Sequence, residues 1–162
     1  MTYHLAIDIG ASSGRHMIGY VENDQLKVQE IYRFKNQLVE KDGHICWDID
    51  RLFDEILNGM KRCKQLDMIP QTMGIDTWGC DYVLLDPQGN RISHAIAYRD
   101  EIHEQYAGQY LKNNSKYELY ARNGLQYQPF NTLFQLYGDQ RKSEAETFLM
   151  IPDYLAYRLT GT

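Results

Sequence analysis

The chain has 162 residues, the length of one domain and enough to bury a core of its own. Apolar residues make up 43% and charged residues 24%, as in ordinary soluble globular proteins. The formal net charge is −5, and no long basic run occurs. Composition therefore argues against nucleic acid or an anionic membrane surface as a partner.

The cysteines and the N-terminus bear on the cellular compartment. Cys46, Cys63 and Cys80 lie far apart and form no CxxC pair, which is typical of reduced thiols in a cytosolic protein. The histidines show no metal-ligand spacing, so no protein metal cage is expected. The apolar run in MTYHLAIDIG is too short for a signal peptide or a membrane span. We expect a cytoplasmic protein.

The first part of the chain alternates strand signals with turn signals. Leu5–Ile9 is nearly continuous apolar, as expected for a strand buried on both faces. The stretch 10–14 predicts a tight turn, and a second strand follows near His16–Val21. After a second turn at Asn23-Asp24, apolar and polar residues alternate over 26–34. These segments predict an antiparallel three-stranded meander.

An amphipathic helix and a further strand come next. Apolar residues recur at steps of three and four between positions 52 and 66, with acidic residues before them and basic residues in the last turns. Pro70 is expected to end this helix. Because the Thr72–Asp76 strand follows a crossover, we expect it to pair in parallel with the first strand.

The second half of the chain is predicted to be mainly helical. Tyr82–Leu85 is expected to be a strand that ends at the Asp86–Asn90 turn. Further on, Thr132 and Gln135 have the spacing of a capping box at the start of a helix. The final helix runs into Gly161 with no tail or closing strand after it. A truncated chain is the simplest interpretation.

The stretch DIGASSGR at Asp8–Arg15 carries the clearest functional signal. It lies at the end of a strand, and successive backbone N–H groups in such a small-residue turn form an anion-binding concavity. The hydroxyl groups of Ser12 and Ser13 would add donors, and Arg15 would add positive charge. Asp8 suits a hydrated Mg²⁺, which takes only one or two carboxylates.

Two other phosphate motifs are excluded. The spacing is not GxxxxGK(S/T), and a dinucleotide-binding fingerprint needs a helix after its glycines, where a strand pattern follows here. A crossover needs about a dozen residues or more, so the loop is expected to be a hairpin tip. An ordinary hairpin with small turn residues is the alternative. A buried acid at Asp8 weighs against it, because such an acid is costly unless paired or metal-associated.

Several segments together resemble the sugar kinases of the FGGY class, within the actin, hexokinase and heat-shock ATPase superfamily. The segments are DIGASSGR at Asp8–Arg15, GIDTWGCDYVLLD at Gly74–Asp86, AYRD at Ala97–Asp100, and GLQYQPFNTLFQL at Gly124–Leu136 with MIPDYLAYRLTG at Met150–Gly161. They extend over essentially the whole chain, in the order and spacing of the family. Within the class, the branch that acts on L-rhamnulose is most similar.

The resemblance implies a ribonuclease-H-like (actin-like ATPase) α/β fold, with a mixed sheet that opens on the antiparallel meander and is flanked by helices. Residues 1–162 would form the first part of the N-terminal kinase domain, without the C-terminal nucleotide domain. The implied reaction transfers the γ-phosphoryl group of ATP, with Mg²⁺, to the 1-hydroxyl of L-rhamnulose. The catalytic Asp of the family is expected beyond Thr162, so the chain alone is expected to be inactive.

The resemblance also assigns site residues. The residues that match the ATP-phosphate segment are Ala11, Ser12, Ser13, Gly14 and Arg15, with Asp8 as the metal residue acting through water. Gly79 matches a sugar-contacting glycine. The other residues expected to line the sugar pocket are Asp76, Trp78, Asp81, Tyr98, Arg99, Phe130 and Asn131.

Other interpretations of the same residues stay open. Taken singly, each pocket residue also suits a structural role in packing, a turn or a surface ion pair. The chain could belong to a fuculokinase or a xylulokinase, although the 74–86 loop favours L-rhamnulose. A non-catalytic sugar-binding or regulatory protein of the same fold is a third interpretation. We also expect the isolated chain to self-associate, because its last helices carry more apolar side chains than one small layer covers.

Overall fold

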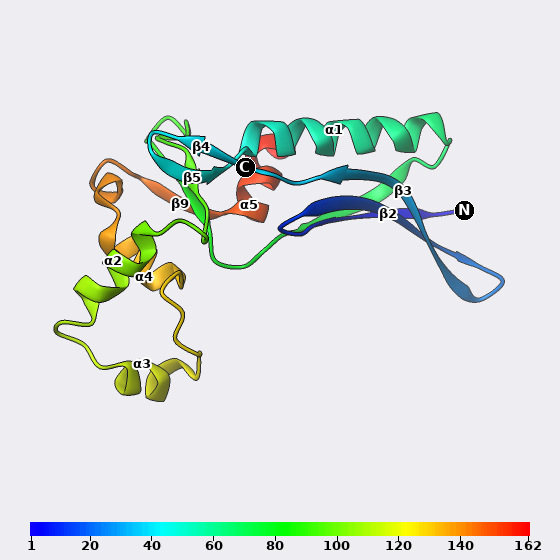
Figure 1. Cartoon of the computed structure of the whole chain (residues 1–162). Coiled ribbons are helices and arrows are strands. Elements are labelled where there is room, and N and C mark those ends of the chain that lie inside the picture. Colours follow the sequence, from blue (N-terminus) through cyan, green and yellow to red (C-terminus); the bar gives the residue numbers. More distant parts are fainter. The chain divides into compact units, whose positions relative to one another are not determined.

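The computed structural model describes residues 1–162, and the chain divides into two units (Figure 1). Unit 1 comprises Met1–Leu38, Asp48–Gly79 and Ile151–Thr162. Unit 2 comprises Val39–Trp47 and Cys80–Met150. None of the helices combines the length and the apolar character that crossing a membrane would require.

Unit 1 contains a mixed four-stranded sheet in the order β3-β2-β1-β6, together with two helices. Its elements are β1 Tyr3–Ile9, β2 Ser13–Glu22, β3 Gln25–Lys35, α1 Ile49–Gln65, β6 Pro70–Asp76 and α5 Ile151–Thr160. Strand β2 pairs antiparallel with both β1 and β3, whereas β6 pairs in parallel with β1. The predicted meander and the predicted parallel strand are both confirmed.

Strand β1 is buried on one face only, which corrects the expectation of burial on both faces. Leu5, Ile7 and Ile9 are buried, whereas Ala6 is exposed and Asp8 is half-buried. Alternate residues of a strand point to opposite faces, so the Ala and Asp of LAIDI share the more open face. The acid at position 8 is therefore accessible at the sheet surface.

Helix α1 covers the apolar face of this sheet (Figure 1). The side chain of Asp48 caps the helix by accepting a hydrogen bond from the N–H of Arg51 at 3.3 Å. Leu52 and Ile56 are fully buried on the helix face that the 3.6-residue spacing predicted. The helix ends at Gln65, ahead of Pro70, so the expectation that Pro70 ends it is wrong; this proline begins β6 instead.

Unit 2 contains two small sheets and the remaining helices. Its elements are β4 Leu38–Lys41, β5 His44–Trp47, β7 Tyr82–Leu85, β8 Ala95–Ile96, α2 Ile102–Tyr110, α3 Lys116–Asn123, α4 Thr132–Gly138, the short 3₁₀ helix η1 Gln140–Ser143 and β9 Thr147–Met150. The sheets have the orders β4-β5-β8 and β7-β9. The predicted strand β7 and the predicted helical character beyond residue 100 are confirmed, but β4, β5, β8 and β9 were not predicted.

The exposure of α4 bears on the expected self-association. Leu133 and Tyr137 on this helix are 41% and 43% exposed, whereas Phe134 is buried. On α5, by contrast, Ile151 and Leu155 are fully buried. Large exposed side chains scattered singly are normal on protein surfaces, so self-association stays a prediction.

Candidate active site

Asn36, the residue after β3, stabilises the tip between β1 and β2 through hydrogen bonds. The N–H of Gly10 donates to the carbonyl of Ser13 at 2.9 Å and closes the turn. Asn36 then brackets the tip, because its backbone N–H donates to Ser12 O at 2.9 Å and its side-chain Nδ2 donates to Gly10 O at 2.9 Å. The backbone N–H groups of Ala11 and Ser12 donate to no atom of the chain. Adjacent free amides in a fixed turn suit an anion.

Gly14, within the same segment, has a packing role. A Cβ built on this glycine would lie 2.1 Å from the ring of Phe34 on β3. No side chain larger than hydrogen fits there unless the ring moves. Gly14 therefore shapes the packing of the sheet behind the tip.

A row of charged side chains crosses the open face of the sheet beside the tip. Asp8 on β1 pairs with Arg15 on β2, with 2.7 Å between Oδ2 and the guanidinium Nη2, and about half of each side chain is exposed. On its other side, Asp8 is the register partner of Asp76 on β6. Partners in neighbouring strands share a face, so the row reads Arg15, Asp8, Asp76. Both acids end parallel strands, the edge where ligands bind in open α/β sheets.

This row fits a hydrated divalent cation. Mg²⁺ keeps several of its waters and binds through one or two carboxylates plus phosphate oxygens. Asp8 and Asp76 supply carboxylates on adjacent strands, and Asp8 is accessible to water. Arg15 supplies positive charge on the side of the tip.

The loop after β6 carries the next predicted residues. Trp78 is half-buried, and its carbonyl accepts a hydrogen bond from Thr77 Oγ1 at 3.1 Å. Gly79 is the last residue of unit 1, and a Cβ built on it would meet no atom within 4 Å. The backbone of Gly79 is therefore open on the side where a side chain would project.

In unit 2, two of the predicted sugar-pocket residues form an aromatic pair. The rings of Tyr98 and Phe130 lie 5.4 Å apart between centroids. Exposed Arg99 extends over Tyr98, with its guanidinium carbon 5.4 Å from the ring centroid and Nε 3.3 Å from the hydroxyl. Tilted aromatic pairs of this kind form a packed apolar surface, and the guanidinium of Arg99 places a positive charge at its edge.

The side chains of Asp81 and Asn131, unlike this aromatic pair, are occupied by hydrogen bonds within the protein. Asp81 is fully buried, and its carboxylate accepts hydrogen bonds from the indole Nε1 of Trp47 at 2.6 Å and from the N–H of Tyr98 at 3.0 Å. Asn131 caps the start of α4 by position, and its Nδ2 donates to Gln126 O at 3.1 Å. Both side chains hold other parts of unit 2 in place.

The capping box predicted at Thr132 and Gln135 is wrong. The residue that precedes α4 is Asn131, and neither predicted side chain caps the helix. Instead, Thr132 Oγ1 donates to Cys80 O at 2.9 Å, and Gln135 Nε2 donates to the carboxylate of Asp81 at 2.9 Å. The pattern correctly marked a helix start, but the polar groups serve a long-range contact. Sequence reasoning did not predict these contacts of Gln135, nor the hydrogen bonds of Trp47 and Asn36.

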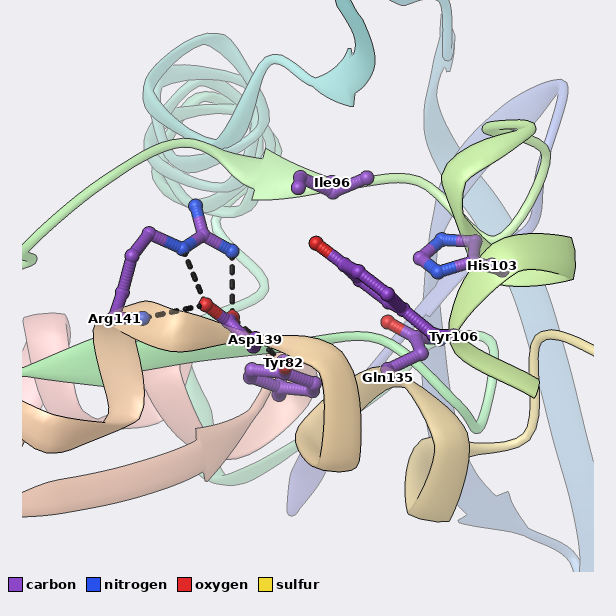
Figure 2. Close-up of a pocket in the computed structure, with 7 residues that line it drawn as sticks. All are labelled: Tyr82, Ile96, His103, Tyr106, Gln135, Asp139 and Arg141. Atoms are coloured by element: carbon purple, nitrogen blue, oxygen red, sulfur yellow. Dashed lines mark hydrogen bonds and ion pairs between the residues drawn. The ribbon is translucent and has the colours of Figure 1, made fainter. Parts of the chain in front are cut away.

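A second buried polar cluster adjoins the first, and Gln135 lines the same pocket (Figure 2). Arg141 forms a two-pronged ion pair with Asp139, and both N–O distances are 2.7 Å. The hydroxyl of Tyr82 donates to the same carboxylate at 2.9 Å. Burial opposes ionisation of Asp139, but the contacts with Arg141 and Tyr82 hold its pKa below the usual value. None of these residues belongs to the predicted sites, so this cluster serves as a structural comparison for the Asp81 contacts.

The mixed sheet, with free backbone amides at its hairpin and carboxylates beside them, agrees in fold with a known class of protein. The chain belongs to the FGGY family of carbohydrate kinases, since the model of the N-terminal domain of that family matches residues 3–162. Its sequence is 44% identical to the rhamnulokinase of Halalkalibacterium halodurans over 99% of this chain, and 46% identical to that of Bacillus subtilis over 98%. The chain spans only 35% and 33% of the length of these relatives.

Solved structures agree on the fold. The gluconate kinase of Lactobacillus acidophilus matches 99% of this chain with a TM-score of 0.81 at 17% identity. The xylulose kinase of the same organism matches 100% of it with a TM-score of 0.82 at 16% identity. The chain covers 34% of each of those proteins. The predicted actin-like fold class is confirmed.

Proposed function

We propose that the protein containing this chain is an ATP-dependent kinase that phosphorylates the 1-hydroxyl of L-rhamnulose. The observation that carries the proposal is the charged row Arg15, Asp8 and Asp76 beside an open-amide hairpin, in a chain whose similarity to rhamnulokinases extends over its whole length. Residues 1–162 would be the first part of the N-terminal domain of that enzyme.

The hairpin would bind the phosphates of ATP. The free N–H groups of Ala11 and Ser12 would donate to phosphate oxygens, and the hydroxyls of exposed Ser12 and half-buried Ser13 belong to the same tip. Arg15 would contribute positive charge from β2, in exchange for part of its contact with Asp8. Catalysis of phosphoryl transfer rests mainly on positioning and on stabilisation of charge, and this tip supplies both.

Mg²⁺ would accompany ATP and neutralise charge on its phosphate oxygens. Asp8 would hold the hydrated ion through water, and Asp76 on the neighbouring strand is the second carboxylate within the row. Before ATP binds, the ion pair with Arg15 orients the carboxylate of Asp8 on the open face of the sheet.

Two sets of residues, each described within its own unit, are proposed to contact the sugar: Gly79 in unit 1, and the pair of Tyr98 and Phe130 in unit 2. The open backbone at Gly79 allows close approach of a ligand, and the aromatic pair presents an apolar wall to the sugar carbons. Trp78, Arg99 and Asn131 are proposed to complete the lining.

The chemical step needs a base that removes the proton of the 1-hydroxyl while its oxygen attacks the γ-phosphorus and ADP leaves. By family resemblance this base is an Asp, and we expect it in the part of the relatives that this chain does not match. Because the reaction consumes ATP and the cysteines Cys46, Cys63 and Cys80 are free thiols, the cytoplasm is the compartment that fits.

The test is a coupled assay of ADP release by the complete protein with L-rhamnulose, L-fuculose and D-xylulose in parallel. We expect kcat/KM for L-rhamnulose to exceed the other two by about tenfold or more, which corresponds to about 1.4 kcal/mol in transition-state binding. A preference for L-fuculose or D-xylulose would assign the protein to another branch of the family. Sugar binding without ATP turnover would instead support a non-catalytic protein.

A further inference from the structure

The carboxylate of Asp81 is saturated by donors from the protein. Its Oδ2 accepts from Trp47 Nε1 at 2.6 Å and from the N–H of Tyr98 at 3.0 Å. Its Oδ1 accepts from Gln135 Nε2 at 2.9 Å and from the thiol of Cys80 at 3.6 Å. The side chain has 0% exposure. A carboxylate occupied in this way is a fixed point of the structure and presents no free oxygen to a sugar.

Gln135 links the carboxylate of Asp81 to the backbone just before α4. Besides its bond to Asp81, Nε2 donates to Phe130 O at 2.8 Å and lies 3.3 Å from Cys80 O. Thr132 Oγ1 reaches the same carbonyl of Cys80. One buried amide therefore ties the backbone of Phe130 to the loop that begins at Cys80.

Trp47 links the same carboxylate to β5. Its indole ring is buried and lies 6.0 Å from the ring of Tyr98, on which Phe130 in turn packs. The indole N–H and the backbone N–H of Tyr98 share one oxygen of Asp81. Asp81 thus holds Tyr98 in two ways: it accepts a hydrogen bond from the backbone N–H of Tyr98, and it fixes Trp47, whose ring lies beside that of Tyr98. Gln135 holds the backbone of Phe130.

We infer that Asp81 and Gln135 are positioning residues of the sugar site, which set the separation and tilt of the Tyr98–Phe130 pair without touching the sugar. The inference rests on the proposed function. It assigns a different role to Asp81 from the pocket-lining role that sequence resemblance suggested, and it adds Gln135 and Trp47. A buried charge is weak support for stability alone, because an apolar replacement is often equally stable. The presence of a buried charge at Asp81 is better explained by the geometry that it imposes on the rings of Tyr98 and Phe130.

The test compares Asp81→Asn with Asp139→Asn in the complete protein. Both acids are buried in unit 2 and accept hydrogen bonds from an aromatic side chain, but the carboxylate of Asp139 bonds to Tyr82 and Arg141, and only its backbone N–H, which the substitution keeps, reaches Gln135 O at 3.0 Å. In Asp81→Asn an amide N–H₂ must face one of the existing donors, so the contacts with Tyr98 or Gln135 break. We expect the sugar KM to rise about tenfold or more and the ATP KM to stay within about twofold. In Asp139→Asn we expect a lower melting temperature with the sugar KM unchanged.

A second variant keeps the test decisive if Asp81→Asn does not fold. Gln135→Met keeps the volume of the side chain but removes every donor, so Phe130 loses its tie while Trp47 keeps its bond to Asp81. We expect a raised sugar KM with an unshifted indole N–H proton resonance of Trp47, whereas Asp81→Asn should move that resonance as well.

The possible failures are distinguishable. An active Asp81→Asn or Gln135→Met protein with a wild-type sugar KM would overturn the inference and leave the proposed function intact. An equal rise in the sugar KM of Asp139→Asn would mean that general loosening of unit 2 is responsible, and would also overturn it. A wild-type protein that phosphorylates no sugar would overturn both proposals.

Discussion

At the scale of single residues, Asp8 combines accessibility with charge. It is paired with Arg15 across the β1–β2 ladder, and both side chains are about half exposed. An ion pair this exposed contributes little to stability. A change at Asp8 therefore has its main effect on whatever binds beside the hairpin.

We predict that Asp8→Asn in the complete protein lowers kcat by roughly 10²–10³-fold and barely moves the sugar KM, because preorganised charge acts mainly on the transition state. Glu30→Gln is a matched control, since Glu30 forms a similarly exposed ion pair with Arg33 on the same sheet. Steady-state kinetics and melting curves of both variants provide the measurement. A kcat loss shared by the control, or a large fall in melting temperature, would assign Asp8 a structural role.

Gly79 gives the opposite prediction. A Cβ at this position meets no atom within 4 Å, so Gly79→Val should melt like the wild type. If the backbone approaches the sugar here, the branched side chain should raise the sugar KM by about tenfold or more while the ATP KM stays unchanged. Sugar and ATP titrations of the variant check this. An unaltered sugar KM would remove Gly79 from the site.

At the scale of elements, the seating of α1 on the sheet depends on a glycine. A Cβ on Gly59 would lie 2.2 Å from Nε2 of His16, a fully buried ring on β2 that also contacts Ile56 O at 3.3 Å. The Nδ1 atom of this ring has no hydrogen-bond partner. The ring is therefore held by packing and by the single contact of Nε2 with Ile56 O, and its space comes from the absent side chain of Gly59.

We predict that Gly59→Ala destabilises the protein by about 1–3 kcal/mol, because overpacking forces the helix or the ring to move. Gly108→Ala in α2 is the control, since a Cβ there meets nothing within 4 Å. Higher helix propensity should make that change neutral or stabilising by up to about 1 kcal/mol. Urea denaturation of both variants gives the comparison, and equal stabilities would contradict the packing argument.

At the scale of the whole molecule, three buried groups couple folding to acid. Burial lowers the pKa of His16 from its ordinary 6.5. Burial opposes ionisation of Asp100, but the N–H groups of Ile102 and Ile45 together with His44 hold its pKa below the ordinary 3.8. The pKa of Asp139 is lowered in the same direction. All three groups bind protons more weakly in the folded state than in the unfolded state.

The stability that these groups contribute is present above their unfolded pKa values and is lost as the pH falls toward the folded ones. We predict that the free energy of unfolding begins to fall below about pH 6.5 through His16 and falls more steeply below about pH 4 through the two acids. Urea midpoints between pH 8 and 3 test this, and Asp139→Asn should flatten only the lower part. Stability that rises on acidification would contradict it.

The chain by itself is predicted to show no sugar kinase turnover. It spans about a third of the length of the rhamnulokinases that it resembles, and the base and the adenine site are expected in the remainder. Loss of general-base help typically costs about 10²–10⁴-fold, and loss of positioning costs more. ADP release dependent on L-rhamnulose from the purified 162-residue chain, above a control without enzyme, would contradict this.

The sequence by itself determined the elements whose signals are local. The meander follows from period-two alternation and turn residues, and α1 follows from its apolar spacing and from Asp48. The hairpin at 10–14 also follows from neighbouring residues, and its phosphate role stays a proposal. Family resemblance supplied the fold class, which the structural matches confirm.

Only the tertiary structure decided which side chains meet. It placed Asp8 on the open face of the sheet and buried Asp81 completely. It also turned Gln135 from a predicted helix cap into a partner of Asp81, 54 positions away in sequence. The physical reason is that the hydrogen bonds of a buried polar group are satisfied by whatever the fold brings within about 3 Å. Sequence spacing does not encode such distant partners.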